Sequence, residues 1–288
     1  MLTKQLKWVL LFTLAIIWGS SFILMKKGLL GLNPYQIGAL RIIFTAIFVL
    51  IIGFKTLPEI KLHQWKYIAV TSLFGTFIPA FLFPLAETKV SSSVCSILNS
   101  LTPLNTLIIG ILAFGLSFKR SQFLGVLIGL IGTAILIFNG KESGENANYY
   151  YSIFVIIASI CYAINVNLIK KYLSDVKPLS ITTANFLVML FPALLILFFT
   201  DFTTRLHFQE TRTAMIYIVI LGVVGTGIAN IIFFKLIQMS SPVFATSVTY
   251  LIPIVAFFWG LLDNENLTPI QFCGAFVILV GVYLANRK

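Results

Sequence analysis

Ten long runs of the sequence are apolar and almost free of charge, and they constrain the fold more than any other feature. Nine contain no Asp, Glu, Lys or Arg, and the tenth is interrupted only by Arg41. About 20 apolar residues suffice for a helix to cross a bilayer, where a helix satisfies its own backbone hydrogen bonds. The sequence therefore predicts an all-α membrane protein with ten transmembrane helices. The runs are residues 8–25, 28–54, 67–86, 90–118, 121–140, 146–169, 178–200, 213–234, 236–262 and 266–286.

The composition excludes several other classes of protein. Hydrophobic residues make up 59% of the chain and charged residues only 10%, against roughly 25% charged residues in a typical soluble domain. The net charge of +11 is spread over the segments between the apolar runs, so we expect no nucleic-acid partner. The cysteines, Cys95, Cys161 and Cys273, lie in separate runs without pair spacing, which indicates neither a disulfide framework nor a metal site.

The two halves of the chain repeat one another. Because each half holds five predicted helices, an odd number, the second half must enter the membrane from the opposite side. This is typical of an inverted-topology repeat, and we expect repeat units at residues 1–140 and 146–288. A chance alignment of two apolar stretches is the alternative. At a spacing of 150 the matches are Gly75, Thr76, Ile78, Phe83, Ser91, Leu101, Pro103, Gly110 and Leu112 with Gly225, Thr226, Ile228, Phe233, Ser241, Leu251, Pro253, Gly260 and Leu262.

The charges between the runs predict an orientation. With the N-terminus in the cytosol, thirteen lysines and arginines fall on the inner side and six on the outer side. Positive residues favour the cytosolic loops, so we expect both termini in the cytoplasm and a multi-pass protein in the inner (plasma) membrane. The first run resembles a signal peptide in its basic start, but it continues to Met25 and is more simply the first helix.

Several motifs, in this order and at these spacings, resemble the EamA family of the drug/metabolite transporter superfamily over the whole chain, as two EamA units. The resemblance implies a central cavity walled mainly by the first, third, fourth, sixth, eighth and ninth helices. It also implies export or exchange of small metabolites, often amino acids. One departure is that residues 115–119 lack the acidic residue that the second half carries as Glu265, so a paired carboxylate is in doubt. The motifs are Trp18-Gly19-Ser20-Ser21-Phe22, Arg41, Ser91 to Pro103, Ser241 to Pro253, and Glu265, Leu267 and Thr268 with Gln271 and Gly274.

Polar side chains concentrate in the six helices that would wall such a cavity. A polar group inside a span needs a partner, a cavity or water, so these residues are candidates for substrate contact. The alternative is that they join helices, at roughly 0.6 kcal/mol for each hydrogen bond. The predicted substrate-binding residues are Trp18, Ser21, Thr76, Ser96, Asn99, Tyr162, Asn165, Thr226, Asn230, Thr246, Thr249 and Tyr250.

Two prolines and one arginine have specific predicted roles. Pro103 and Pro253 lie at equivalent places in the repeat, in mid-span, and we expect them to act as hinges. Arg41 is the one charge well inside a span, and it is either an anchor at the outer interface or a clamp for a substrate carboxylate. Glu87 and Glu265 are expected to be solvated boundary charges or, alternatively, gating groups.

These features favour a secondary transporter over an enzyme. No acidic residue lies deep in a span, so we expect transport down the substrate gradient or coupling through groups that the sequence does not reveal. No Walker A loop and no metal or nucleophile motif occurs, so no cofactor is expected. The aromatic residues close to the expected cavity suit neutral or zwitterionic solutes. We expect a monomer or homodimer in the lipid bilayer that exports amino acids or related metabolites by alternating access. A carrier of another cargo, such as a drug, a sugar conjugate or a lipid-linked head group, is the second interpretation, and a membrane-embedded enzyme is the third.

Overall fold

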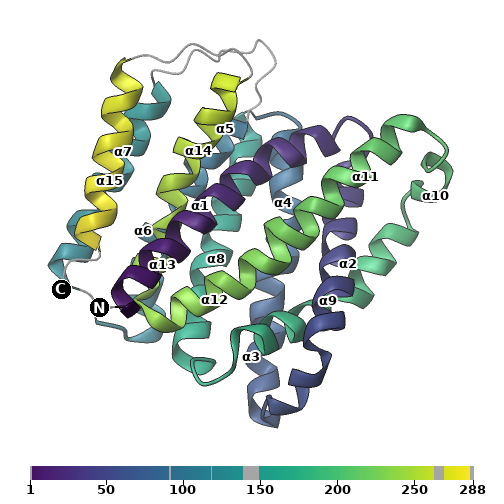
Figure 1. Cartoon of the computed structure of the whole chain (residues 1–288), viewed down its shortest axis with the longest axis horizontal. Coiled ribbons are helices and arrows are strands. Elements are labelled where there is room, and N and C mark those ends of the chain that lie inside the picture. Colours follow the sequence, from purple (N-terminus) through teal and green to yellow (C-terminus); the bar gives the residue numbers. More distant parts are fainter. Residues whose placement is uncertain (1, 91, 118, 139–148, 263–268, 286–288) are drawn as a thin grey trace.

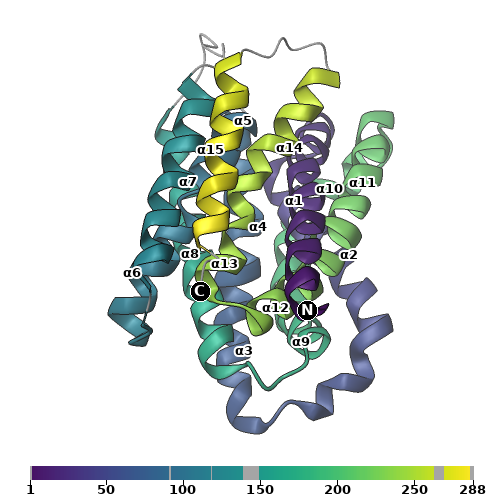
Figure 2. The ribbon, with the colours of Figure 1, turned by 60° about the vertical axis from the view of Figure 1, so that its left-hand side comes forward.

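The computed structural model describes residues 2–90, 92–117, 119–138, 149–262 and 269–285. Throughout these ranges the regular structure is helical, and long helices stand side by side (Figure 1). The start of α1 and the end of α15 lie at the same end of the molecule (Figure 2). The expectation of an all-α membrane protein is confirmed, since six helical stretches are long and apolar enough to cross a membrane by length and composition.

The first half contains seven α-helices and a π-helical segment, η3. A capping box at Asn33 and Gln36, followed by Pro34, starts α2. The segments α3, η3 and α4 follow one another without a break and form one rod. The bounds are α1 (Leu2–Gly28), α2 (Pro34–Gly53), η1 (Phe54–Glu59), η2 (Leu62–Gln64), α3 (Trp65–Ser72), η3 (Leu73–Phe77), α4 (Ile78–Glu87), α5 (Ser92–Asn99), α6 (Thr102–Phe114) and α7 (Arg120–Phe138).

The second half repeats this order, including the π-helical segment. Here α11, η5 and α12 form the rod that corresponds to α3, η3 and α4. The bounds are η4 (Tyr149–Tyr151), α8 (Ser152–Tyr172), α9 (Pro178–Phe198), α10 (Phe202–Arg205), α11 (Gln209–Gly222), η5 (Val223–Ile228), α12 (Ala229–Met239), α13 (Pro242–Thr246), α14 (Val248–Leu262) and α15 (Pro269–Ala285).

The ten expected spans are not all matched by single long helices. Six stretches qualify as candidate spans: Gln5–Gly28, Pro34–Glu59, Leu62–Glu87, Ser152–Tyr172, Pro178–Phe198 and Gln209–Met239. The fourth and ninth expected helices are each divided, into α5 with α6 and α13 with α14. The count of ten remains a prediction for the other four.

Each half packs against the other through equivalent elements. Helix α1 lies against α11, α12 and α14, and α8 lies correspondingly against α3, α4 and α6. The pairs α2 with α9 and α7 with α15 lie side by side, the latter as a separate pair at one edge (Figures 1 and 2). The halves are therefore interleaved around α1 and α8 at the centre.

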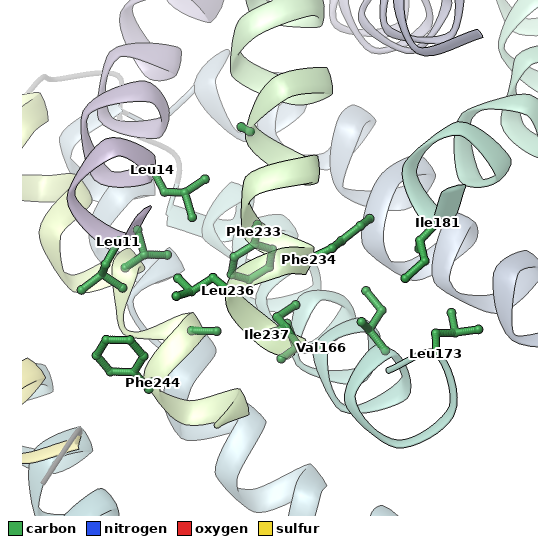
Figure 3. Close-up of a cluster of buried hydrophobic side chains, with 14 of the residues drawn as sticks. Leu11, Leu14, Val166, Leu173, Ile181, Phe233, Phe234, Leu236, Ile237 and Phe244 are labelled. Carbon is green, nitrogen blue, oxygen red and sulfur yellow. The ribbon is translucent and has the colours of Figure 1, made fainter. Parts of the chain in front are cut away.

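Two of the buried apolar clusters lie on either side of the middle of α1. The larger contains Leu11 and Leu14 of α1 with residues of α8, α9, α12 and α13 (Figure 3). The second contains Phe22 and Met25 of α1 with Phe83 of α4 and residues of α5 and α11. The polar residues of α1 that were predicted to contact substrate lie between the two.

The close pairing of α7 and α15 gives a test of the fold. A Cβ atom at Gly281 would lie 2.5 Å from the Gly129 backbone nitrogen and 2.8 Å from the Gly125 carbonyl oxygen. Since backbone atoms cannot move aside, Gly281→Ala should separate the helices and cost about 1–3 kcal/mol. We expect a clear fall in the thermal unfolding midpoint of the purified protein. Leu279→Ala, on an exposed part of α15, is the control; an equal effect of both substitutions would contradict close packing at Gly281.

Candidate functional site

A cavity lies in the middle of the molecule between the two halves, and we call it the chamber. Its walls come from α1, α2, η3, α4, α5 and α6 of the first half and from α8, α9, α11, η5, α12, α13 and α14 of the second. Ten of the twelve predicted substrate-binding residues line it, namely Trp18, Ser21, Thr76, Asn99, Tyr162, Asn165, Thr226, Asn230, Thr246 and Thr249.

The remaining two predicted residues do not line the chamber. Tyr250 is fully buried, its hydroxyl donates to the Val126 carbonyl at 3.1 Å, and its ring lies against Gly129 of α7. Ser96 is 1% exposed on α5. The structure thus places Tyr250 in helix packing, where it attaches α14 to α7, rather than beside a solute.

The lining residues come in equivalent pairs from the two halves. The prediction from sequence missed Phe83, Phe233, Thr102 and Ile42, although the repeat spacing already matched Phe83 with Phe233. The pairs at a spacing of 150 are Thr76 with Thr226, Ala80 with Asn230, Phe83 with Phe233, Asn99 with Thr249 and Thr102 with Ile252, and those at 144 are Trp18 with Tyr162, Ser21 with Asn165 and Ile42 with Phe186.

Each rod turns into a π-helix where it passes the chamber. Thr76 lies in η3 and Thr226 in η5, so both members of a repeat pair lie in a widened turn. Such turns leave backbone groups without their usual helical partners and are frequent at functional sites. In η5 the Gly225 carbonyl accepts a hydrogen bond from Trp18 Nε1 at 3.0 Å, and just before it Gly222 accepts one from Thr45 Oγ1 at 2.7 Å.

Small residues in the π-helices allow α1 and α8 to approach closely. A Cβ atom on Gly225 would meet the Ser21 side chain, and one on Gly75 would meet the amide of Asn165. Ser21 and Asn165 are themselves equivalent positions, so the two close approaches are the same contact made twice, each time between the two halves. The repeat therefore extends to individual contacts at the chamber wall.

Arg41 of α2 is partly buried at the chamber wall and has no acidic partner within salt-bridge distance in the described chain. Its Nε donates to Thr226 Oγ1 at 2.6 Å, and Thr226 donates in turn to the Leu221 carbonyl at 2.9 Å. The other guanidinium nitrogens donate to no described residue. A partly buried cation without a salt bridge is costly, and the remaining N–H groups of Arg41 are where a bidentate carboxylate could bind.

The equivalent position in the second half is chemically different. Asn185 of α9 is fully buried, and its Oδ1 accepts a hydrogen bond from Thr71 at 2.9 Å. It does not line the chamber. The positive charge of the chamber is therefore confined to the Arg41 side.

The two prolines free carbonyls that hydroxyl groups then occupy. Pro103 cannot donate to the Asn99 carbonyl one turn earlier, and Thr102 Oγ1 donates to it at 2.7 Å. Pro253 likewise leaves the Thr249 carbonyl free, and Ser100 Oγ donates to it at 3.0 Å. Neither proline lines the chamber. Pro103 lies at the start of α6, beside the break from α5, whereas Pro253 lies inside α14, and their role as hinges stays a prediction.

Glu87 differs from the expectation of a solvated boundary charge. It ends α4, and both of its carboxylate oxygens are buried. Glu265 and Thr268, also singled out from the sequence, lie outside the described residues, as does Ser91. The described lining of the chamber contains no acidic residue.

Comparisons with known proteins agree with this architecture. The model of the EamA-like transporter family matches residues 6–138 and again residues 150–287. The chain is 27% identical to the "Uncharacterized inner membrane transporter YedA" of Escherichia coli K12, over 96% of this chain and 89% of that protein. It is 24% identical to the "Probable amino-acid metabolite efflux pump" of the same strain, over 96% and 93%.

A more distant bacterial relative and a solved structure extend the comparison. The "Uncharacterized transporter YoaV" of Bacillus subtilis is 23% identical over 94% of both chains. One crystal structure superposes with a TM-score of 0.75 over 96% of this chain and 95% of its own, at 14% identity, which shows a shared fold. Since the matching family consists of transporters, the expectation that the protein is not an enzyme is confirmed.

The contact between Trp18 and the π-helix can be tested directly. Trp18→Phe keeps an aromatic ring but removes the donor to the Gly225 carbonyl. Leaving that buried carbonyl unpaired should cost about 1–3 kcal/mol, seen as a lower thermal unfolding midpoint. Trp259→Phe, which removes an indole hydrogen bond to Ser20 at an exposed site, should change the midpoint much less. Equal midpoints for Trp18→Phe and the unmodified protein would contradict a structural role for this bond.

Proposed function

Because the chain belongs to the EamA-like transporter family, we propose that it is a secondary carrier that exports amino acids or related metabolites through the chamber by alternating access. In this proposal the ten helices form two inverted repeats in the inner membrane with both termini cytoplasmic. The chamber is exposed to each side in turn as the halves exchange conformations. One chain contains the whole chamber, so a monomer is sufficient, whether or not two copies associate.

The observation that carries the proposal is the pairing of lining residues from the two halves. A chamber built from equivalent positions can be closed on either side by the same kind of movement. It also lies between two apolar clusters, one on each side along α1, which can act as alternating barriers. A channel or an enzyme does not require either feature.

The composition of the chamber supports an amphipathic, carboxylate-bearing solute. Arg41 supplies a positive charge without a salt bridge in the described chain, and Asn230, one turn after Thr226, supplies an amide at the chamber wall. Aromatic and aliphatic side chains such as Phe83, Phe233 and Ile252 provide apolar contact. The similarity to a probable amino-acid metabolite efflux pump favours amino acids within this class.

Flux in liposomes tests the proposal. The purified full-length chain is reconstituted, and the flux of each standard amino acid is measured with radiolabel. We expect saturable flux for at least one of them, competed by the free amino acid but not by its carboxyl amide, because the amide cannot pair with Arg41. Saturable flux of none would exclude amino acids, and competition by drugs or sugar conjugates would then favour the second cargo class.

Arg41→Gln tests the role of the charge. Removing a charge-assisted contact worth about 1.5–3 kcal/mol should lower the flux at subsaturating substrate by about tenfold or more, while the amide derivative binds no worse than before. Arg120→Gln, at an exposed position where α7 begins, is the matched control. Unchanged apparent affinity in Arg41→Gln would show that the arginine only anchors α2.

A further inference from the structure

Two oxygens of the chamber lining are fully buried and have no partner in the part of the chain that the structure describes. Thr76 is 5% exposed and Asn165 is 2% exposed, and both line the chamber. Neither Thr76 Oγ1 nor Asn165 Oδ1 takes part in a hydrogen bond with any described residue. A buried polar group without a partner costs roughly 1–3 kcal/mol, so this pair lowers the stability of the solute-free protein.

Several other polar residues of the chamber form hydrogen bonds within the protein. Thr246 donates to the Pro242 carbonyl of its own helix at 3.0 Å, and Thr249 donates to the Thr246 carbonyl at the end of α13 at 2.9 Å. Asn99 Oδ1 accepts from Thr102 at 3.2 Å. Thr226, the repeat partner of Thr76, is bonded both to Arg41 and to the Leu221 carbonyl. The fully buried oxygens of the described lining that lack a partner therefore belong to the first π-helix and to α8.

The local backbone keeps this pair in position. Asn165 lies against Gly75, the residue before Thr76, at a distance that leaves no room for a side chain there. One turn earlier on α8, Tyr162 stacks on Phe83 with ring centroids 6.0 Å apart. The amide and the hydroxyl thus occupy a fixed, apolar-walled corner in which only a ligand or water can supply the missing hydrogen bonds.

We propose that Thr76 and Asn165 form a neutral subsite that accepts hydrogen bonds from the ammonium group of a solute whose carboxylate is held by Arg41. This inference rests on the proposed function and adds to it the orientation in which the solute lies in the chamber. Arg41 of α2 binds the acid group, and Thr76 of η3 and Asn165 of α8 supply the oxygens that bind the amine. A carboxylic acid without an amine leaves the pair unsatisfied and binds more weakly.

Competition for flux tests the subsite. Flux of a radiolabelled mixture of the standard amino acids is competed with L-leucine, with isocaproate, which lacks the amine, and with isoamylamine, which lacks the carboxylate. In the unmodified protein we expect leucine to compete about tenfold better than isocaproate. Thr76→Val and Asn165→Leu should remove this advantage by weakening leucine alone, whereas Arg41→Gln should weaken leucine and isocaproate together.

Asn167 is the matched control, since it is the same residue type on the same helix. Its Nδ2 donates to the Thr106 and Ala163 carbonyls, and it does not line the chamber. Asn167→Ala should leave the ratio of leucine to isocaproate unchanged. If the ratio persists in both Thr76→Val and Asn165→Leu, the subsite is wrong while the proposed function stands; if no amino acid is transported, the proposed function fails.

A second measurement needs no substrate. Thr76→Val removes an unsatisfied hydroxyl with little change of shape, so the thermal unfolding midpoint should stay the same or rise. Thr226→Val at the equivalent position removes two hydrogen bonds, so its midpoint should fall. If Thr76→Val lowers the midpoint as much as Thr226→Val does, the Thr76 hydroxyl is structural and the subsite is overturned.

Discussion

The structure depends on the requirement that backbone groups in a bilayer find partners without water. Two π-helices and two mid-span prolines release carbonyls in the middle of the protein, and the partners come largely from the other half. Trp18 and Thr45 of the first half donate to η5 and to the residue just before it, and Ser100 donates to the carbonyl that Pro253 leaves free. In the opposite direction, Asn167 donates to the Thr106 carbonyl and Tyr250 to that of Val126. The bonds made by Trp18, Thr45 and Ser100 thus satisfy carbonyls at or beside breaks in the helical ladders, and all five bonds join the two halves.

The repeat fixes where side chains lie but not which chemistry they carry. Thr76 and Thr226 occupy equivalent turns, yet only Thr226 has a partner, because Arg41 has Asn185 as its counterpart. Likewise Ala80 faces the chamber where the second half has Asn230. A symmetric backbone supports the exchange of two conformations. An asymmetric set of side chains gives a bound solute one preferred orientation within the chamber. The two properties are independent and can change separately.

Much of this arrangement could be predicted from the sequence because it follows from periodicity. Ten of twelve candidates line the chamber, since polar residues in apolar helices must face a cavity or a neighbour. Tyr250 does not line the chamber although its neighbour Thr249 does, because adjacent residues on a helix point about 100° apart. The Tyr250 ring packs on Gly129 of α7, which is just over 120 residues away in the sequence, and no local pattern links them. The π-helices could not be predicted from the sequence either, because they arise from packing around Gly75 and Gly225 rather than from the helix propensity of the residues.

The bond between Arg41 and Thr226 restricts how a carboxylate can approach. Because Nε is already used, only the two terminal nitrogens remain, so a carboxylate must bind end-on across both of them. Binding then leaves the bond between the halves intact and adds a second one through the solute. A solute whose ammonium also reaches the corner at Asn165 touches α2 and α8, which belong to different halves. Such a solute stabilises the halves around itself, whereas one that reaches only Arg41 does not. The positions of Arg41 and of the corner at Asn165, rather than the size of the chamber, would then decide which solutes favour closure of the chamber.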